Sequence, residues 1–213
     1  MMCIKRMLLG VLVLLAMPAF AQQDPQRVVM DTAETVLAEV SARKADLEAD
    51  SSLIYPLVER TVVPHFDFES MARSAMGRFW RKATPQQQRR VVAEFRELLV
   101  RTYATALLGY SGQEIDYPPM HVADGAKSVM VPTNIKAEGG PPVPVNYRLK
   151  MRDGQWLVYD VVIDGISLVT NYRSTFARQI QVGASKEKDR AKRMGAGIDS
   201  LIQALSSKND KSA

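Results

Sequence analysis

The sequence has 213 residues, of which 46% are apolar and 24% are charged. This is the composition of an ordinary globular protein with one sizeable hydrophobic core or two small ones. The formal net charge of +5 would suggest a nucleic-acid-binding protein. However, residues 186–193 contain five basic and two acidic side chains, a surplus equal to the whole net charge of residues 22–213, which is +3. The sequence therefore predicts one local basic segment, and it argues against a nucleic-acid partner.

The first 21 residues have the layout of a secretory signal peptide. Lys5 and Arg6 precede an apolar run over residues 7–16, and Ala19-Phe20-Ala21 forms a small-x-small cleavage site. This run is too short to span a bilayer, which needs about 20 apolar residues. We expect cleavage after Ala21 and export to a bacterial periplasm as a soluble protein. Cleavage also removes Cys3, the only cysteine, so the exported protein has no thiol or disulfide.

The first half of the exported chain predicts four helices with apolar residues at helical spacing. They begin at Asp24, Asp50, Asp67 and Thr84, each of which is a residue type that favours the N-cap position. The last start is the strongest, because Thr84 is followed by a first-turn proline and by a glutamine that completes a capping box. We expect this long helix to stop at Gly109.

The apolar period then changes from about 3.6 residues to 2, which predicts strands. We expect strands over residues 127–136, 145–151 and 156–163. Pro132 lies inside the first of them and predicts an edge or a bulge. Asp153-Gly154 predicts a tight hairpin between the other two. The last strand is apolar on both faces, so we expect it to lie centrally in the sheet.

Ser167 is expected to cap a helix that reaches Ile180, and residues 184–194 resemble a charged insertion before a short final helix. Residues 207–213 are expected to form a disordered tail. The order of helices, meander and helices predicts a single α+β domain over residues 22–206. In this fold, a helical N-terminal half packs on a twisted, mainly antiparallel sheet of about four strands, with C-terminal helices.

No motif of a known catalytic class is present: there is no glycine-rich phosphate loop, no Gly-x-Ser-x-Gly elbow and no His-Glu-x-x-His pair. The exported chain has only His65 and His121 and no cysteine, so we expect no metal site. His65 and Asp67 could form a catalytic pair, but we favour the interpretation that His65 ends one helix and Asp67 caps the next. Asp160 could be a buried catalytic acid, but a carboxylate in a central strand is more often paired with arginine or backbone donors.

Several blocks of the sequence resemble MlaC-type periplasmic phospholipid-binding proteins, also called toluene-tolerance proteins. The blocks occur in the same order over nearly the whole exported chain. They include Pro64-His65-Phe66-Asp67-Phe68, Gly77-Arg78-Phe79-Trp80-Arg81, Arg101-Thr102-Tyr103, Trp156-Leu157-Val158-Tyr159-Asp160-Val161 and Asn171-Tyr172-Arg173-Ser174-Thr175-Phe176. The charged stretch 184–194 departs from this pattern.

The resemblance implies a carrier with an apolar cavity and no catalytic activity. Such a protein shuttles phospholipid between an outer-membrane lipoprotein complex and an inner-membrane ABC transporter with an MCE-domain subunit, and thereby maintains outer-membrane lipid asymmetry. No cofactor is implied, because phospholipid is the cargo. The apolar pattern alone fits a filled interior equally well, since periodicity does not distinguish a filled core from a hollow one.

If the interior is hollow, we expect its lining to come from the inward faces of the strands and of two helices. Arg148 is a candidate for contact with a lipid headgroup. The expected lipid-binding residues are Leu99, Tyr103, Leu107, Val131, Val145, Tyr147, Leu149, Val158, Val161 and Tyr172.

Two alternatives remain open from the residues themselves. The first is a periplasmic hydrolase that uses His65 or Asp160 on lipid-like substrates, and the second is a lipid-free adaptor with a fully packed interior. The basic segment 186–193 is either a solvated linker or a transient contact for an acidic partner or an anionic lipid surface.

Overall fold

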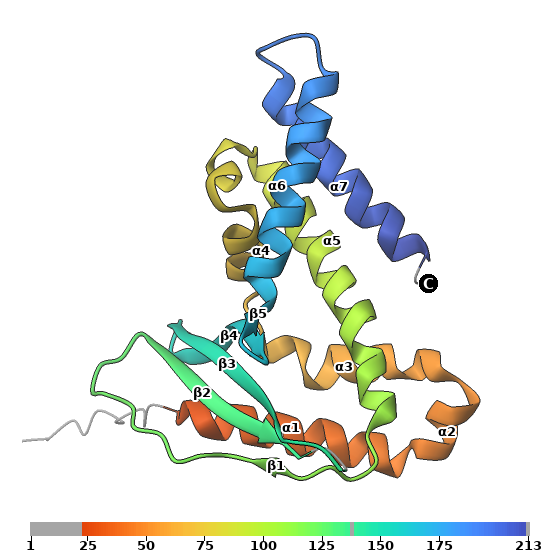
Figure 1. Cartoon of the computed structure of the whole chain (residues 1–213), viewed down its shortest axis with the longest axis vertical. Coiled ribbons are helices and arrows are strands. Elements are labelled where there is room, and N and C mark those ends of the chain that lie inside the picture. Colours follow the sequence, from red (N-terminus) through yellow and green to blue (C-terminus); the bar gives the residue numbers. More distant parts are fainter. Residues whose placement is uncertain (1–22, 137–138, 212–213) are drawn as a thin grey trace, which may run out of the picture.

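The computed structural model describes residues 23–136 and 139–211, so the expected signal peptide lies outside the described residues. Helical segments come first, a five-stranded sheet follows, and two long helices close the chain (Figure 1). The architecture is α+β, as predicted. No helix among the described residues is both long and apolar enough to cross a membrane.

The helical segments of the first half are α1 (Pro25–Ala42), α2 (Lys44–Ala49), η1 (Ser51–Leu53), α3 (Ile54–Thr61), η2 (Val63–His65), α4 (Phe68–Met76), η3 (Gly77–Lys82), α5 (Pro85–Ala104) and η4 (Thr105–Gly109). Four of them, α1, η1, α4 and α5, begin at the predicted caps, and the other five begin elsewhere. The Asp24 carboxylate accepts a hydrogen bond from the Gln26 backbone N–H, and Thr84 and Gln87 form the expected capping box at the start of α5. Gly77 has a φ of 53°, which lets the chain turn sharply between α4 and η3.

The sheet is antiparallel, with its strands in sequence order. They are β1 (Ile115–Asp116), β2 (Ser128–Ile135), β3 (Val143–Arg152), β4 (Gln155–Ile163) and β5 (Ile166–Ser167). Asp153 and Gly154 both have positive φ and form the tight β3–β4 hairpin. β1 pairs only with residues 134–135, so β2 has a free edge at Pro132, as that proline predicted. The two outer strands are only two residues long and leave no alternating pattern, which explains why about four strands were expected.

The C-terminal region differs from the prediction because its helices are longer. α6 (Leu168–Lys186) and α7 (Arg193–Lys211) form a helical hairpin with a connection of only six residues, so five of the eleven residues of the expected insertion 184–194 are helical. The expected tail 207–213 is helical as far as Lys211. Asn209 is buried, and its side-chain amide donates hydrogen bonds to the backbone oxygen and the carboxylate of Glu94, which fixes the end of α7 against α5.

Three clusters of buried side chains form the core. The first joins α4, η3, α5, α6 and α7, the second joins the sheet to the start of α1, and the third joins the end of α1 to α2, α3 and the end of α5. In Figure 1, α6 and α7 rise away from the sheet, whereas α1 passes behind its strands at the other end of the molecule. The sheet meets the upper helices at β4, which contacts α4, η2 and α6.

Candidate functional site: an apolar cavity

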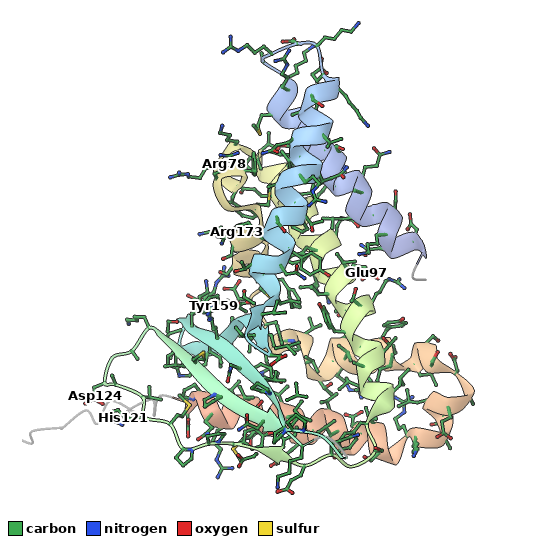
Figure 2. The ribbon with its side chains drawn as sticks, viewed as in Figure 1. Arg78, Glu97, His121, Asp124, Tyr159 and Arg173 are labelled. Carbon is green, nitrogen blue, oxygen red and sulfur yellow. The ribbon has the colours of Figure 1, made fainter. Side chains whose placement is uncertain are left out.

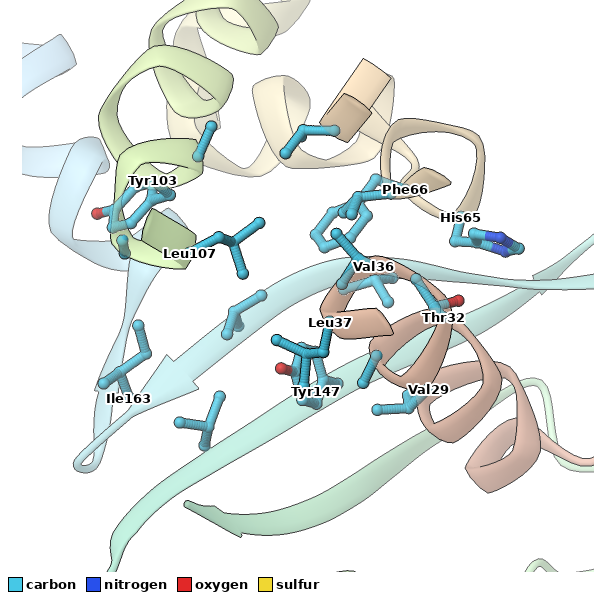
Figure 3. Close-up of a pocket in the computed structure, with 18 of the residues that line it drawn as sticks. Val29, Thr32, Val36, Leu37, His65, Phe66, Tyr103, Leu107, Tyr147 and Ile163 are labelled. Carbon is cyan, nitrogen blue, oxygen red and sulfur yellow. The ribbon is translucent and has the colours of Figure 1, made fainter. Parts of the chain in front are cut away.

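A cavity of about 650 Å³ lies where the three core clusters meet. Its walls come from α1, α3, η2, the C-terminal part of α5, η4 and the strands β2, β3 and β4. This volume lies within the range of about 300–1,000 Å³ that is usual for ligand sites. Figure 3 shows side chains of α1, α5, η4 and the sheet converging on the same space.

The lining is almost entirely aliphatic and aromatic. Apart from three tyrosines, the polar side chains among the described lining residues are Thr32, His65, Gln113 and Lys136. Lys136 lies at the rim, where its Nζ is 2.8 Å from a carboxylate oxygen of Glu114. An interior of this kind can hold hydrocarbon but offers few hydrogen bonds to a polar ligand.

Seven of the ten predicted lipid-binding residues line the cavity. Tyr103 and Leu107 face it in Figure 3 from α5 and η4, and Tyr147 faces it from β3. The full set is Leu99, Tyr103, Leu107, Val145, Tyr147, Val158 and Val161. The alternation along β3 and the helical face of α5 identified these positions, because both patterns point toward the sheet–helix interface.

The other predicted residues are not in the lining. Val131 and Leu149 are fully buried in the sheet cluster, where the start of α1 and Trp156 pack against them. Leu149 shares a face of β3 with Val145 and Tyr147, but packing within this cluster covers it completely, so it does not reach the cavity. Tyr172 packs edge-on against Phe95 at a centroid distance of 5.0 Å and belongs to the helical core.

Arg148, the predicted headgroup residue, lies on the polar side of β3. Its guanidinium is 3.2 Å from the carboxylate of Asp160, which also accepts hydrogen bonds from the Ser167 hydroxyl and the Val169 backbone N–H. Asp160 is therefore satisfied by an arginine, a hydroxyl and a backbone donor, as the sequence favoured. This network fixes the start of α6 against β4.

The tyrosines give the cavity a small number of neutral polar groups. Burial, with a smaller contribution from Tyr117, raises the pKa of Tyr147 to about 12, and its hydroxyl has no hydrogen-bond partner among the described residues. Burial, together with the adjacent Tyr103, likewise raises the pKa of Tyr172 to about 12. Tyr172 hydrogen-bonds to Tyr103, so it contacts a lining residue without lining the cavity itself. These phenols remain uncharged at neutral pH.

The sequence did not reveal the contribution of α1 or of the segment after α3. One face of α1 supplies six lining residues, namely Val28, Val29, Thr32, Ala33, Val36 and Leu37. Phe66 and Phe68 add two aromatic rings whose centroids are 5.8 Å apart. The apolar face of α1 was visible in the sequence, but its partner was not, because α1 packs across strands that follow it by about 100 residues.

No catalytic constellation is present among the described residues. His65 lines the cavity, but its ring points away from the other labelled side chains in Figure 3, and no hydroxyl or carboxylate hydrogen-bonds to it. Asp67 caps α4 and His65 ends η2, as the sequence favoured. The described residues also contain no group of three or more potential metal ligands. These residues offer no activated nucleophile for the hydrolase alternative.

The fold and the cavity together define an α+β protein built around a site for an apolar ligand. Comparison with known proteins gives the family: residues 30–207 match the family described as MlaC protein. This match covers most of the sequence, and the chain belongs to the MlaC family, whose members are lipid-binding carriers rather than enzymes.

Individual relatives agree with this assignment. The chain is 32% identical over 176 residues to the toluene tolerance protein ttg2D of Pseudomonas putida, with 81% of each sequence covered. It is 23% identical over 154 residues to the intermembrane phospholipid transport system binding protein MlaC of Haemophilus influenzae, covering 71% of this chain and 72% of that protein. Among solved structures, it is similar to a phospholipid-binding protein of Ralstonia solanacearum in complex with a phospholipid. That similarity has 32% identity and a TM-score of 0.76, and it covers 89% of this chain and 99% of the other.

Proposed function

We propose that this protein is a periplasmic carrier that holds the acyl chains of a phospholipid in the cavity between α1, α5 and the sheet. The observation that carries the proposal is the apolar lining of the cavity. Among the described lining residues, Lys136 at the rim and His65 are the ones with a basic side chain. The family and the phospholipid-bound relative support the same conclusion. We further propose that residues 1–21 are removed after Ala21 on export.

The energetics of transport explain why a hollow interior is needed. A diacyl lipid carries roughly 30 methylenes, and exposing them to water would cost on the order of 24 kcal/mol at about 0.8 kcal/mol each. The cavity hides the chains during transit. Release into a bilayer or a partner exchanges one apolar environment for another, so loading and unloading need little net free energy.

We infer that the lipid headgroup remains at the mouth of the cavity. Tyr103, Val143 and Ile163 all line the cavity, yet each is 38% exposed, so they form an apolar rim that is open to water. Lys136 lies at this edge and has the charge to contact a phosphate. Arg148 is less suited to that role, because it projects from the other face of β3 and does not line the cavity.

In its cellular role, the proposed carrier receives phospholipid from one membrane system and delivers it to another. The proposed partners are an outer-membrane lipoprotein complex and an inner-membrane ABC transporter that bears an MCE-domain subunit. This route would maintain the lipid asymmetry of the outer membrane. The name of the Haemophilus influenzae relative, an intermembrane phospholipid transport system binding protein, supports this assignment.

A pair of charge substitutions on α1 tests the proposal. Leu37 lines the cavity and is half-buried, whereas Thr35 on the same helix is exposed and outside the lining. Leu37→Asp places a carboxylate among the acyl chains, where an unpaired charge costs several kcal/mol, so phospholipid that copurifies should fall more than about tenfold. Thr35→Asp changes the net charge equally and should leave lipid occupancy unchanged.

The measurement is organic extraction of each purified protein followed by quantitative mass spectrometry. Thermal unfolding of both variants controls for folding. A wild-type protein that is consistently free of phospholipid would support the packed adaptor instead. Full occupancy in folded Leu37→Asp would show that the lipid lies elsewhere.

A further inference from the structure

Basic residues are concentrated at the end of the molecule that is remote from the cavity. This basic end comprises residues 77–93, which form η3 and the first part of α5, and residues 173–199, which form most of α6, the connection and the start of α7. It contains twelve basic and three acidic residues, a net charge of +9. Because residues 22–213 sum to +3, the remainder of that chain carries −6.

The near-neutral total therefore hides a separation of charge. The sequence predicted that the surplus was confined to residues 186–193, but the fold adds further cations to that segment. Gln87 donates hydrogen bonds to the Gly195 backbone oxygen and the Asp199 carboxylate, which ties the start of α5 to the start of α7. Arg173 donates to the Ser74 backbone oxygen and ties α6 to the end of α4. These bonds hold the two basic segments together as one surface.

The cations of the basic end are exposed and mostly lack acidic partners. In Figure 2, Arg78 and Arg173 project outward from the upper helices. Among these cations, only Lys192 forms an ion pair with another described residue. Arg173 and Arg193 donate hydrogen bonds to backbone oxygens. The other nine have no acidic partner among the described residues, namely Arg78, Arg81, Lys82, Arg89, Arg90, Arg178, Lys186, Lys188 and Arg190. Near the sheet, by contrast, Lys136, Arg148, Lys150 and Arg152 all form ion pairs. The three acidic residues of the basic end therefore leave most of its positive charge without an acidic partner among the described residues.

The composition of this surface favours a membrane over a protein partner. Among the large exposed hydrophobic residues, only Val182 belongs to the basic end. Specific protein interfaces usually centre on buried aromatic or aliphatic anchors, which this surface lacks. A bilayer with anionic headgroups needs no such anchor, because its surface potential attracts clustered lysine and arginine side chains without a matching shape.

We propose that the basic end docks this protein reversibly on a bilayer surface rich in anionic phospholipid headgroups. The contact goes beyond the proposed carrier function and does not depend on the cargo. In Figure 1, the connection between α6 and α7 lies at the opposite end of the molecule from the sheet and α1. Docking through the basic end therefore holds the protein near a membrane while the cavity remains accessible to a partner.

Sedimentation with lipid vesicles tests the proposal. The purified protein should bind vesicles of phosphatidylglycerol and phosphatidylcholine, but not vesicles of phosphatidylcholine alone. Binding should weaken steeply as the salt concentration rises from about 0.01 M to about 0.3 M, because the Debye length falls from about 30 Å to less than 8 Å. Binding that is absent at low salt, or that salt does not alter, would overturn the proposal.

Charge-matched variants locate the docking surface. Each cation near the membrane contributes roughly fivefold in partition coefficient, so neutralising three should reduce binding on the order of 100-fold. The test variant replaces Lys186, Lys188 and Arg190 with glutamine. The control replaces exposed cations of the cavity end with glutamine and changes the net charge equally; these are Arg27, Lys44 and Lys127.

The control variant should bind within a few-fold of the wild type. An equal loss in both variants would mean that only the total charge matters, and it would refute a defined docking surface. If the test variant still binds vesicles but no longer supports lipid transport in cells, then the basic end serves an acidic protein and the membrane proposal fails. Circular dichroism verifies that both variants remain helical.

Discussion

Asp67 forms the main electrostatic link between the helical bundle and the sheet, so its carboxylate offers a quantitative test of the fold. Its side chain is buried and caps α4 by accepting a hydrogen bond from the Ser70 backbone N–H. Lys150 and Arg152 of β3 each approach the carboxylate to 2.9 Å. The Asp67 backbone N–H also donates to the Val158 oxygen of β4. One residue thus fixes α4, β3 and β4 next to the cavity wall.

The size of the effect follows from the pKa of Asp67. Burial alone would raise this pKa, but hydrogen bonds from Ser70, Lys150 and Arg152 outweigh burial and lower it from 3.8 to about 2. Because the folded-state pKa lies below the unfolded value, the ionised carboxylate stabilises the fold above about pH 4. That contribution of about 2 kcal/mol is lost as the pH falls from about 4 to 2.

The perturbation is Asp67→Asn, which can still cap α4 but carries no charge. Urea unfolding of the wild type and the variant from pH 7 to pH 2 should show a difference of about 2 kcal/mol at neutral pH. The difference should shrink below pH 4, since the wild type then loses its charge as well. A difference below about 0.5 kcal/mol at pH 7, or one that stays constant down to pH 2, would refute this account of the junction.

Two further predictions concern packing and the cavity. Gly197→Ala should destabilise the protein by about 1–3 kcal/mol in urea unfolding, because an added Cβ would lie 2.4 Å from the Ile180 backbone oxygen. Gly195→Ala in the same helix is the control. It should be neutral or stabilising, because the nearest atom to its added Cβ is 4.0 Å away. Equal effects would contradict the close α6–α7 contact. In lipid extraction, Tyr147→Phe should keep the copurifying phospholipid and Tyr147→Asp should lose it, since only the second breaks the apolar wall. Leu149→Asp should instead unfold the protein, which a thermal melt would show, because Leu149 is fully buried outside the cavity.

Local signals in the sequence predicted the elements well. Asp24, Asp67, Thr84 and Ser167 are all N-caps in the structure, because capping depends on residues within one turn of the helix start. The β3–β4 hairpin likewise follows from two adjacent residues with positive φ. The end of α7 was missed because the burial of Asn209 depends on a distant contact with α5.

The candidate site was only partly predictable, because its shape depends on packing between remote segments. Val131 and Val145 share the same alternating pattern, yet α1 covers the first and the cavity exposes the second. The concentration of positive charge at the basic end was hidden for the same reason, because the net charge of a sequence does not show which charged residues lie close together in the fold. Periodicity identified the strand and helix faces, whereas the hollow between them came from the arrangement of α1.

The most direct test of the central claim is to locate the acyl chains in the bound state. A phospholipid with a photoreactive diazirine in one acyl chain would be loaded into the purified protein, irradiated and mapped by peptide mass spectrometry. The account predicts adducts on the cavity-facing segments of α1, the end of α5, η4, β3 and β4. Adducts confined to α6 and α7, or no adducts with a protein that has bound the lipid, would contradict it.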